Sequence, residues 1–257
     1  MCAAKRGAPP KLSARDAFNL NIEDAETLVA LAKLLQNRRT RKMRRELRQR
    51  AGEALRLPQK QWNDLECLES DAVFAIFKPG HASWRERLTE PALRPLLRQA
   101  LVAACAAVET FCADRVMERY SATMKLEERP RRLLDLPLTV ETHLDIQSHG
   151  KPGQGLRNAV ETQVRQLASP APAQIGELFA LVGEKRLLTR VDGRRGVAKE
   201  TTTADLQRIV ERRNRIAHTG DRAGRGRAAI TVAEVEADLS ILVSIIDALD
   251  AETRPHA

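Results

Sequence analysis

The chain has 257 residues, 43% of them hydrophobic, which is enough to bury a sizeable core in one large domain or two small ones. Its 13 glycines and 12 prolines are too few for a collagen-like or low-complexity linker protein. The net charge of +9 favours anionic partners, whereas two tryptophans, one tyrosine and five phenylalanines are too few for a surface that stacks single-stranded bases. The composition therefore indicates a soluble, basic globular protein.

The first region, residues 1–88, has the pattern of helices. Ser13 to Asp16 is a weak N-cap signal, and apolar residues then recur every three or four positions (Ile22, Ala25, Leu28, Leu31, Leu34 and Leu35). We expect this helix to run through the basic segment that follows and to stop before Pro58. A second helix is expected from Trp62 to Phe77, ended by Pro79-Gly80. This region therefore predicts an N-terminal helical arm or a small helical subdomain.

The basic segment, residues 38–50, carries much of the positive charge. Seven arginines and one lysine face the single carboxylate of Glu46, and the few apolar positions are Met43 and Leu47. Such a segment attracts phosphate and gives salt-dependent binding to nucleic acid. A solvated helix that keeps the protein soluble is the alternative. The candidate RNA-binding residues here are Arg38, Arg39, Arg41, Arg44, Arg45 and Arg48.

The second region, residues 89–257, begins near Thr89-Glu90-Pro91. Apolar and alanine residues at spacings of three and four predict a long, closely packed helix from Leu97 to about Tyr120, which we expect to be the spine of the core. Shorter helices are expected at 156–167 and 175–182. Breaks at 148–155 and at 169–172 separate them.

The last third of the chain has the clearest helix boundaries. Thr202 or Thr203 is the expected cap of a helix that contains Leu206, Ile209, Val210, Ile216 and Ala217, and Gly220 is its expected stop. After a glycine and arginine loop, Thr231 to Glu234 matches a capping box for a final helix that needs a partner along its whole length. No alternating strand pattern and no internal repeat is found. The fold class is therefore all-α.

The candidate site lies on the first of these two helices, in the stretch Glu211-Arg-Arg-Asn-Arg-Ile-Ala-His218. Arg213 falls near the middle of the apolar stripe, where an unpaired arginine is costly, so either a buried carboxylate or a phosphate should meet it. Arg213 and His218 are five residues apart, about 140° around a straight helix and about 7.5 Å along it. A site that uses both needs a distorted last turn or a second copy of the helix.

The chemistry that suits Arg213, Asn214 and His218 is RNA cleavage without a metal or other cofactor. His218 can take the proton of a ribose 2′-hydroxyl or give one to the departing 5′-oxygen. Arg213 can stabilise the phosphorane, and Asn214 can orient the phosphate or the histidine. In the alternative reading, Arg213 is paired with a core carboxylate, Asn214 is a surface residue and His218 is a satisfied histidine at a helix end, where the helix dipole favours it.

The motif Arg-Asn-x-Ile-Ala-His ahead of a long final helix resembles the HEPN superfamily. Together with residues 101–120 as the first core helix, it is most similar to the RiboL-PSP-HEPN branch. The resemblance covers roughly residues 90–250. It implies a helical bundle that dimerises so that two motifs form one cleft, metal-independent endoribonuclease activity, and service in toxin–antitoxin or antiphage defence systems with a cognate partner.

By motif position, the resemblance makes Arg213 and His218 the catalytic pair and Asn214 their polar partner. Glu109, on the first core helix, is the candidate for orienting the arginine, and plain solvation of that helix is the alternative. Arg212 and Arg215 become candidate RNA-binding residues. Arg225 and Arg227, in the loop after the motif, are either RNA contacts or flexible surface charge. Some relatives carry a modifiable tyrosine two residues after the histidine, but this position is Gly220 here.

The cysteines and termini complete the expectations. Cys2, Cys67, Cys105 and Cys112 form no CxxC pair, so we expect reduced thiols and no metal site. We find no signal peptide and no apolar stretch approaching the length of a membrane span, which predicts a cytoplasmic protein that does not contact membrane. Two competing functions remain: a non-catalytic HEPN module that binds RNA or a partner, and an adaptor that acts through residues 38–50 on nucleic acid or a membrane surface.

Overall fold

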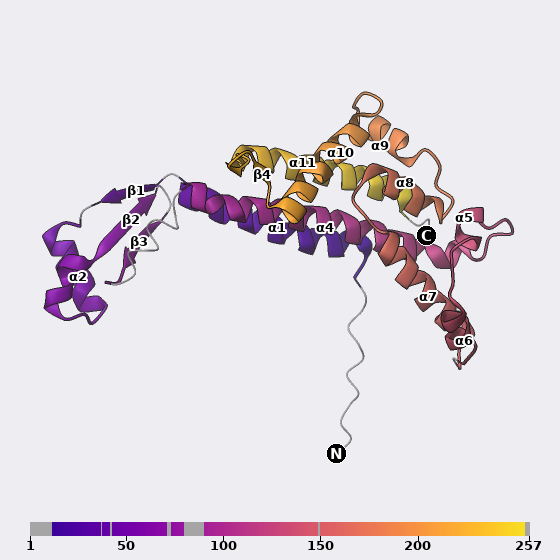
Figure 1. Ribbon diagram of the computed structural model, residues 1–257, viewed down its shortest axis with the longest axis horizontal. Helices are drawn as coiled ribbons and strands as arrows, with labels where there is room; N and C mark the ends of the chain where they lie inside the picture. The colour runs from indigo at the N-terminus through magenta and orange to yellow at the C-terminus, as the bar shows by residue number, and fades with distance from the viewer. Residues whose placement is uncertain are drawn as a thin grey trace, which may run out of the picture.

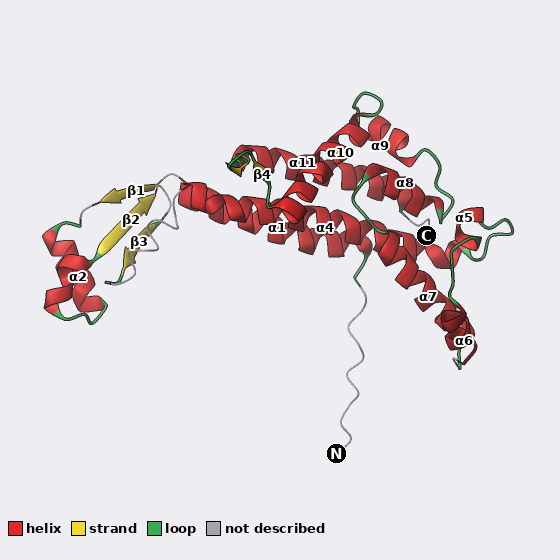
Figure 2. Ribbon diagram, in the orientation of Figure 1, coloured by secondary structure: helices red, strands yellow, loops and turns green. Residues whose placement is uncertain are grey.

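The computed structural model describes residues 12–36, 38–41, 43–70, 73–79, 90–148 and 150–254, apart from the side chains of residues 36, 38–41, 68, 70 and 90–92. Most of these residues are helical (Figures 1 and 2). The main helices are α1 (Ala14–Gln36), α4 (Glu90–Thr123), α7 (Pro152–Leu167), α10 (Thr201–Thr219) and α11 (Val232–Thr253). Shorter ones are α2 (Arg45–Ala54), η1 (Gln59–Asp64), α5 (Arg131–Leu134), α6 (Val140–Ser148), α8 (Pro172–Ala180) and α9 (Leu187–Arg195). The strands are β1 (Arg38–Arg41), β2 (Glu66–Ser70), β3 (Phe74–Phe77), β4 (Arg222–Ala223) and β5 (Gly226–Arg227).

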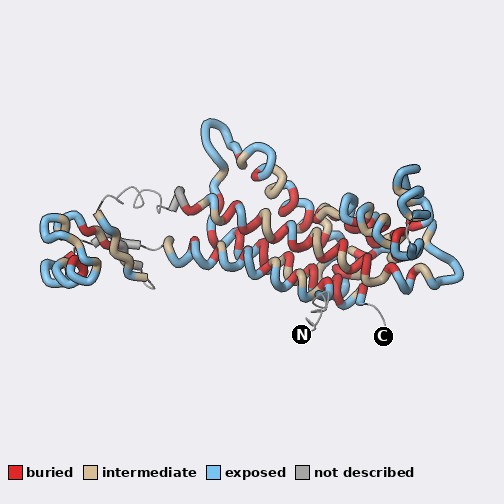
Figure 3. The backbone as a smooth tube through the Cα atoms, turned by 90° about the horizontal axis from the view of Figure 1, so that it is seen from below, coloured by how far each residue is buried: buried red, intermediate tan, exposed pale blue. Residues whose placement is uncertain are grey.

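Helix α4 is the spine that the sequence predicts. It runs antiparallel to α1 along the long axis of the molecule, and its buried alanines let the two backbones approach closely (Figure 1). Phe18 of α1 meets Phe111 of α4 edge to face, with ring centroids 6.1 Å apart. Helices α7, α8, α10 and α11 pack on the other sides of α4, so buried residues line it along most of its length (Figure 3). The all-α class is confirmed.

Helix α4 is also long and apolar enough to cross a membrane by length and composition, over Leu93–Thr123. The expectation that no stretch approaches this length was therefore wrong. Its apolar side chains are those of a core helix, because 61% of the most apolar window is buried against the neighbouring helices. The helices that bury α4 come from both ends of the chain, and a scan of composition along the sequence does not take such tertiary contacts into account.

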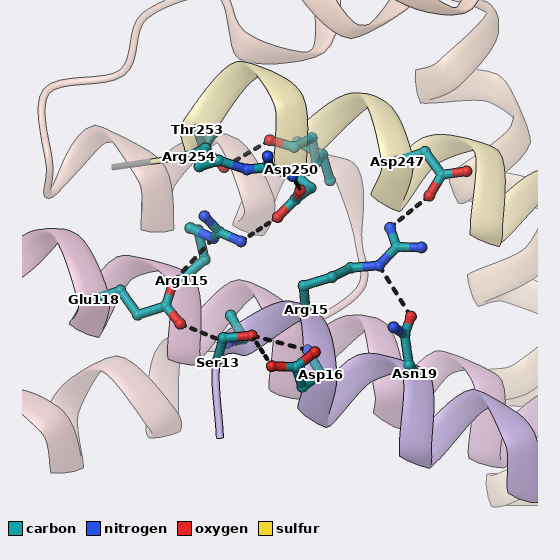
Figure 4. Close-up of polar contacts among 12 residues, drawn as sticks. Ser13, Arg15, Asp16, Asn19, Arg115, Glu118, Asp247, Asp250, Thr253 and Arg254 are labelled. Atoms are coloured by element: carbon teal, nitrogen blue, oxygen red, sulfur yellow. Dashed lines mark hydrogen bonds and ion pairs between the residues drawn. The ribbon is translucent and has the colours of Figure 1, made fainter. Parts of the chain in front are cut away.

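Polar contacts hold the N-terminal end of α1 against α4 and α11 (Figure 4). Ser13 caps α1 as predicted, since its Oγ accepts a hydrogen bond from the Asp16 backbone at 3.1 Å. Glu118 of α4 accepts from the Ala14 backbone, and Arg15 pairs with Asp247 of α11. Arg115 and Asp250 form a buried ion pair between α4 and α11. These contacts make α1 part of the helical bundle.

The two helices predicted here, one ending before Pro58 and one from Trp62 to Phe77, were wrong over three segments. Strands β1, β2 and β3 form an antiparallel sheet, with Arg41 opposite Cys67 and Cys67 opposite Ile76. Of the residues described between 38 and 77, those at 45–54 and 59–64 are helical. The sheet and α2 enclose a separate small core of Met43, Ala51, Leu65 and Cys67. Whether residues 1–88 and 89–257 are separate domains stays a prediction, and their boundary lies outside the described residues.

Several helix boundaries follow the predictions and others do not. Gly220 ends α10 with a left-handed φ of 61°, and Thr231 with Glu234 forms the capping box of α11. Neither Thr202 nor Thr203 caps α10. Asp192 of α9 does so instead, accepting hydrogen bonds from the backbone of Glu200 at 2.7 Å and of Thr202 at 2.8 Å. Helix α9 itself was not predicted.

The prediction of buried, reduced thiols is confirmed for Cys67, Cys105 and Cys112, while Cys2 lies outside the described residues. Three residues assigned to apolar stripes are exposed, namely Leu31, Leu34 and Ala217. The buried stripe of α1 instead follows Phe18, Ile22, Ala25, Val29 and Ala32. The stripe of α10 ends at Ile216.

Candidate functional site

The motif helix α10 is anchored by its apolar side. Leu206, Ile209 and Val210 are buried among α4, α9 and α11, and the helix stays regular to Thr219. A distorted last turn, one of the two ways to bring Arg213 and His218 together, is therefore absent. The two side chains leave the helix about 140° apart, and about 7.5 Å separates them along the axis.

Arg213 lies half-buried where α10 crosses α4. Its Nη1 donates to the Asn214 side chain at 3.1 Å, and its Nε is buried without a hydrogen-bond partner. Among the described residues no carboxylate lies within salt-bridge distance of it. The described residues therefore do not include the ion pair between Arg213 and a core carboxylate that the alternative requires. The guanidinium keeps donors and charge for an incoming anion.

Glu109 of α4 lies near enough to Arg213 for their charges to interact. Desolvation raises the pKa of this half-buried carboxyl above its ordinary value, and the nearby Arg213 charge only partly opposes that effect. One turn earlier on α4, burial raises the pKa of the Cys105 thiol to about 12 although Arg213 lowers it. Glu109 is therefore close enough to influence the arginine electrostatically without forming a direct ion pair, and Cys105 is an inert neutral thiol.

His218 is exposed in the last turn of α10. In the described part of the chain its ring makes no hydrogen bond, so its orientation is not fixed within one copy. Asn214, four residues earlier, lies on the same flank of the helix and is half-buried. Beyond the helix end, a Cβ placed at Gly220 would lie 3.8 Å from Nη2 of Arg227. An arginine therefore lies beside the position where some relatives carry a tyrosine.

Asp221, the residue after Gly220, joins the motif helix to the spine. It is fully buried with a left-handed φ of 61°. Its Oδ2 accepts from Nη2 of Arg212 at 2.7 Å and from Nε of Arg98 on α4 at 3.3 Å. The same arginines donate to the carbonyls of Ala229 and Ala228, each at 2.7 Å. Arg212, a candidate for RNA binding, is thus engaged inside the protein.

The other candidate RNA-binding residues fall into three groups. Arg44, Arg45 and Arg215 are exposed. Arg48 is turned inward and donates to Asn63 at 2.8 Å and to the Met43 carbonyl at 2.9 Å. Arg38, Arg39 and Arg41 lie on β1, and their side chains are outside the described residues.

Sequence reasoning gave no role to Asp221, Arg98 and Asp192, which hold the two ends of the motif helix. The Gly-Asp pair after His218 was visible in the sequence, but its partner Arg98 is 123 residues away. Across the described ranges no group of three or more histidine, cysteine or carboxylate side chains is placed to hold a metal ion.

A long central helix crossed by a helix with an Arg-Asn-x-x-x-His motif is the arrangement of an HEPN-class bundle. Family comparison agrees: the RiboL-PSP-HEPN profile matches residues 81–253, which is more than half of the chain and includes the motif. The chain belongs to the RiboL-PSP-HEPN family, and HEPN proteins are often ribonucleases or RNA-binding proteins. Searches of curated proteins and of solved structures find no match to it.

Proposed function

We propose that this protein is a metal-independent endoribonuclease. The observation that carries the proposal is the state of Arg213: it is half-buried, forms no salt bridge among the described residues and keeps a buried Nε without a partner. Burying a cation is costly unless an anion compensates it. A phosphodiester with two non-bridging oxygens fits a guanidinium of this kind.

The roles of the three motif residues follow from their chemistry. His218 takes the proton of the 2′-hydroxyl or gives one to the departing 5′-oxygen. The 2′-oxygen forms a bond to phosphorus and the bond from phosphorus to the 5′-oxygen breaks, which leaves a 2′,3′-cyclic phosphate and a 5′-hydroxyl. Arg213 stabilises the charge of the phosphorane, and Asn214 holds one side of the guanidinium. DNA lacks the attacking hydroxyl and should resist cleavage.

The active unit is proposed to be a homodimer. On one regular helix, Arg213 points toward the packed side and His218 toward solvent, so the two cannot easily grip one phosphate. A two-fold pairing of α10 with α10 of a second copy would bring Arg213 of each copy near His218 of the other. Each cleft would then use groups from both subunits.

The biological setting is proposed to be cytoplasmic, as a toxin or defence effector with a cognate antitoxin or defence partner. The second candidate function is a non-catalytic HEPN module for RNA binding or partner docking. The separation of Arg213 and His218 within one copy favours it, because a monomer of this form has no complete site.

Incubation of purified protein with end-labelled RNA in EDTA tests the proposal. Wild type should cut RNA and leave DNA of the same sequence intact. His218→Ala should lower the rate by about 10²–10⁴-fold. His143→Ala is the matched control, since His143 is also an exposed helical histidine but lies on α6. Cleavage that chelation abolishes, or equal cleavage by wild type and His218→Ala, would overturn the proposal.

A further inference from the structure

Residues 38–79 form a small basic unit that we call the head, made of β1, α2, η1, β2 and β3. It lies beyond the far ends of α1 and α4, away from the bundle (Figure 1), and has its own small core. The RiboL-PSP-HEPN match starts at residue 81 and so leaves the head out. Its presence is therefore not explained by the cleavage domain.

The described surface of the head is dominated by cations. Its exposed basic residues outnumber its exposed carboxylates by two to one. The basic residues are Arg44, Arg45, Arg50, Arg56, Lys60 and Lys78, and the carboxylates are Glu46, Glu53 and Asp64. Phe74 of the edge strand β3 is also exposed. Cations spread over a surface bind a phosphate backbone without reading its sequence, and a single exposed ring can stack on one base without forming a stacking platform.

A second basic element lies between the head and the motif. The β4–β5 hairpin exposes Arg222, Arg225 and Arg227, and the last of these reaches back to Gly220 at the end of the motif helix. Arg98 of α4 holds the base of this hairpin through the Ala228 carbonyl. Arg98 is eight residues from the first residue of α4, about 12 Å of helix. The hairpin and the head thus lie toward the same end of the bundle (Figure 1).

We infer that the head and the hairpin form an RNA-binding surface that holds a single strand of substrate and leads it to the motif. The inference extends the proposed function, because it says how a long RNA is captured. RNA is favoured over an anionic membrane because the two basic elements continue to the motif, whose chemistry suits a phosphodiester. Binding by the head does not itself require cleavage, so the two ideas can fail separately.

The binding test uses full-length protein carrying His218→Ala, so that RNA is not cut. Labelled single-stranded RNAs of about 5 and about 30 nucleotides are titrated by fluorescence anisotropy. Adding Arg44→Glu, Arg45→Glu and Lys60→Glu should weaken binding of the long RNA about tenfold or more and reduce its salt slope by about 2. Lys125→Glu, Arg131→Glu and Arg132→Glu, on exposed residues at the opposite end, make the same charge change and should leave binding nearly unchanged.

The cleavage test uses the same head substitutions in the wild-type background. They should raise KM for the long RNA and leave kcat/KM for the short RNA within about twofold. Equal RNA affinity of the head variant and the opposite-end variant, or head-dependent binding to phosphatidylserine vesicles but not to RNA, would overturn the inference while leaving the nuclease proposal intact. Head-dependent RNA binding without any cleavage would sustain the inference and defeat the nuclease proposal. Circular dichroism of each variant is the control for folding.

Discussion

Oδ2 of Asp221 lies 2.7 Å from Nη2 of Arg212, the residue before the motif arginine Arg213. Arg98 joins them from α4, at 3.3 Å from the same carboxylate oxygen. Because Arg212 precedes Arg213 on the helix, this cluster fixes the motif turn against the spine and places the hairpin beyond it. Arg212 thus stabilises the fold, while its neighbour Arg213 stays available for an anion.

Removing the Asp221 carboxylate should be costly, because two cations then lack their counter-charge. We expect Asp221→Ala to lower the free energy of unfolding by about 3–5 kcal/mol. Asp221→Asn keeps a side chain that tolerates the left-handed backbone and accepts hydrogen bonds, so its loss should be smaller. Urea unfolding followed by circular dichroism measures both, and wild-type stability in Asp221→Ala would contradict the structural role of the cluster.

Asp192 should be the residue that caps the motif helix. Burial alone would raise the pKa of Asp192, but hydrogen bonds from Thr202 and Glu200 outweigh it and lower the pKa below the ordinary value. The stabilisation is therefore present at neutral pH and is lost as the pH falls below that ordinary value. Asp192→Ala should cost about 1–2 kcal/mol at pH 7 and less in acid. Thr203→Ala, at one of the two caps expected from the sequence, is the control, and its unfolding curve should match wild type.

Glu109→Gln should separate stability from function. Since burial raises the pKa of Glu109, ionising it opposes folding, and its contribution to stability falls as the pH rises through the raised value. The amide removes that penalty, so Tm at pH 7 should not drop and its pH dependence should flatten. If Glu109 orients Arg213, the cleavage rate should nevertheless decrease. Unchanged cleavage would remove Glu109 from the site.

Gly52→Ala should damage the head alone. A Cβ at Gly52 would lie 2.3 Å from Cδ1 and Nε1 of Trp62, so the indole must move, at about 1–3 kcal/mol. The main bundle has a separate core and should keep its Tm. Limited proteolysis should then cut the head first. Gly176→Ala, at a helical glycine with open space around it, is the matched control and should leave the pattern unchanged.

The long helices could be predicted because their apolar residues repeat over many turns, as in α4 and α11. The sheet of the head could not. Trp62, Leu65, Leu68, Val73 and Phe77 fit a helical spacing, yet they lie on η1, β2, β3 and their connections. Runs of four or five residues are too short for periodicity to decide between helix and strand. Strand β1, Arg-Arg-Thr-Arg, has no apolar alternation and is defined by its pairing with β2.

The motif residues could be identified from the sequence, but their ion pairs and hydrogen bonds in the fold could not. Whether Arg213 is neutralised depends on its distance from Glu109, which lies on another helix. The partners of Asp221 and the cap from Asp192 are likewise tertiary contacts. What the helical period did predict was the divergence of Arg213 and His218, and the regular end of α10 agrees with it.

Mixing two inactive variants tests the central claim most directly. Arg213→Ala and His218→Ala proteins are each assayed on RNA in EDTA, alone and after joint denaturation and refolding. If each cleft takes Arg213 from one copy and His218 from the other, mixed dimers contain one intact cleft, and the mixture should recover about a quarter of the wild-type rate. Active wild type together with an inactive mixture would contradict a shared cleft, and inactive wild type would contradict the nuclease itself.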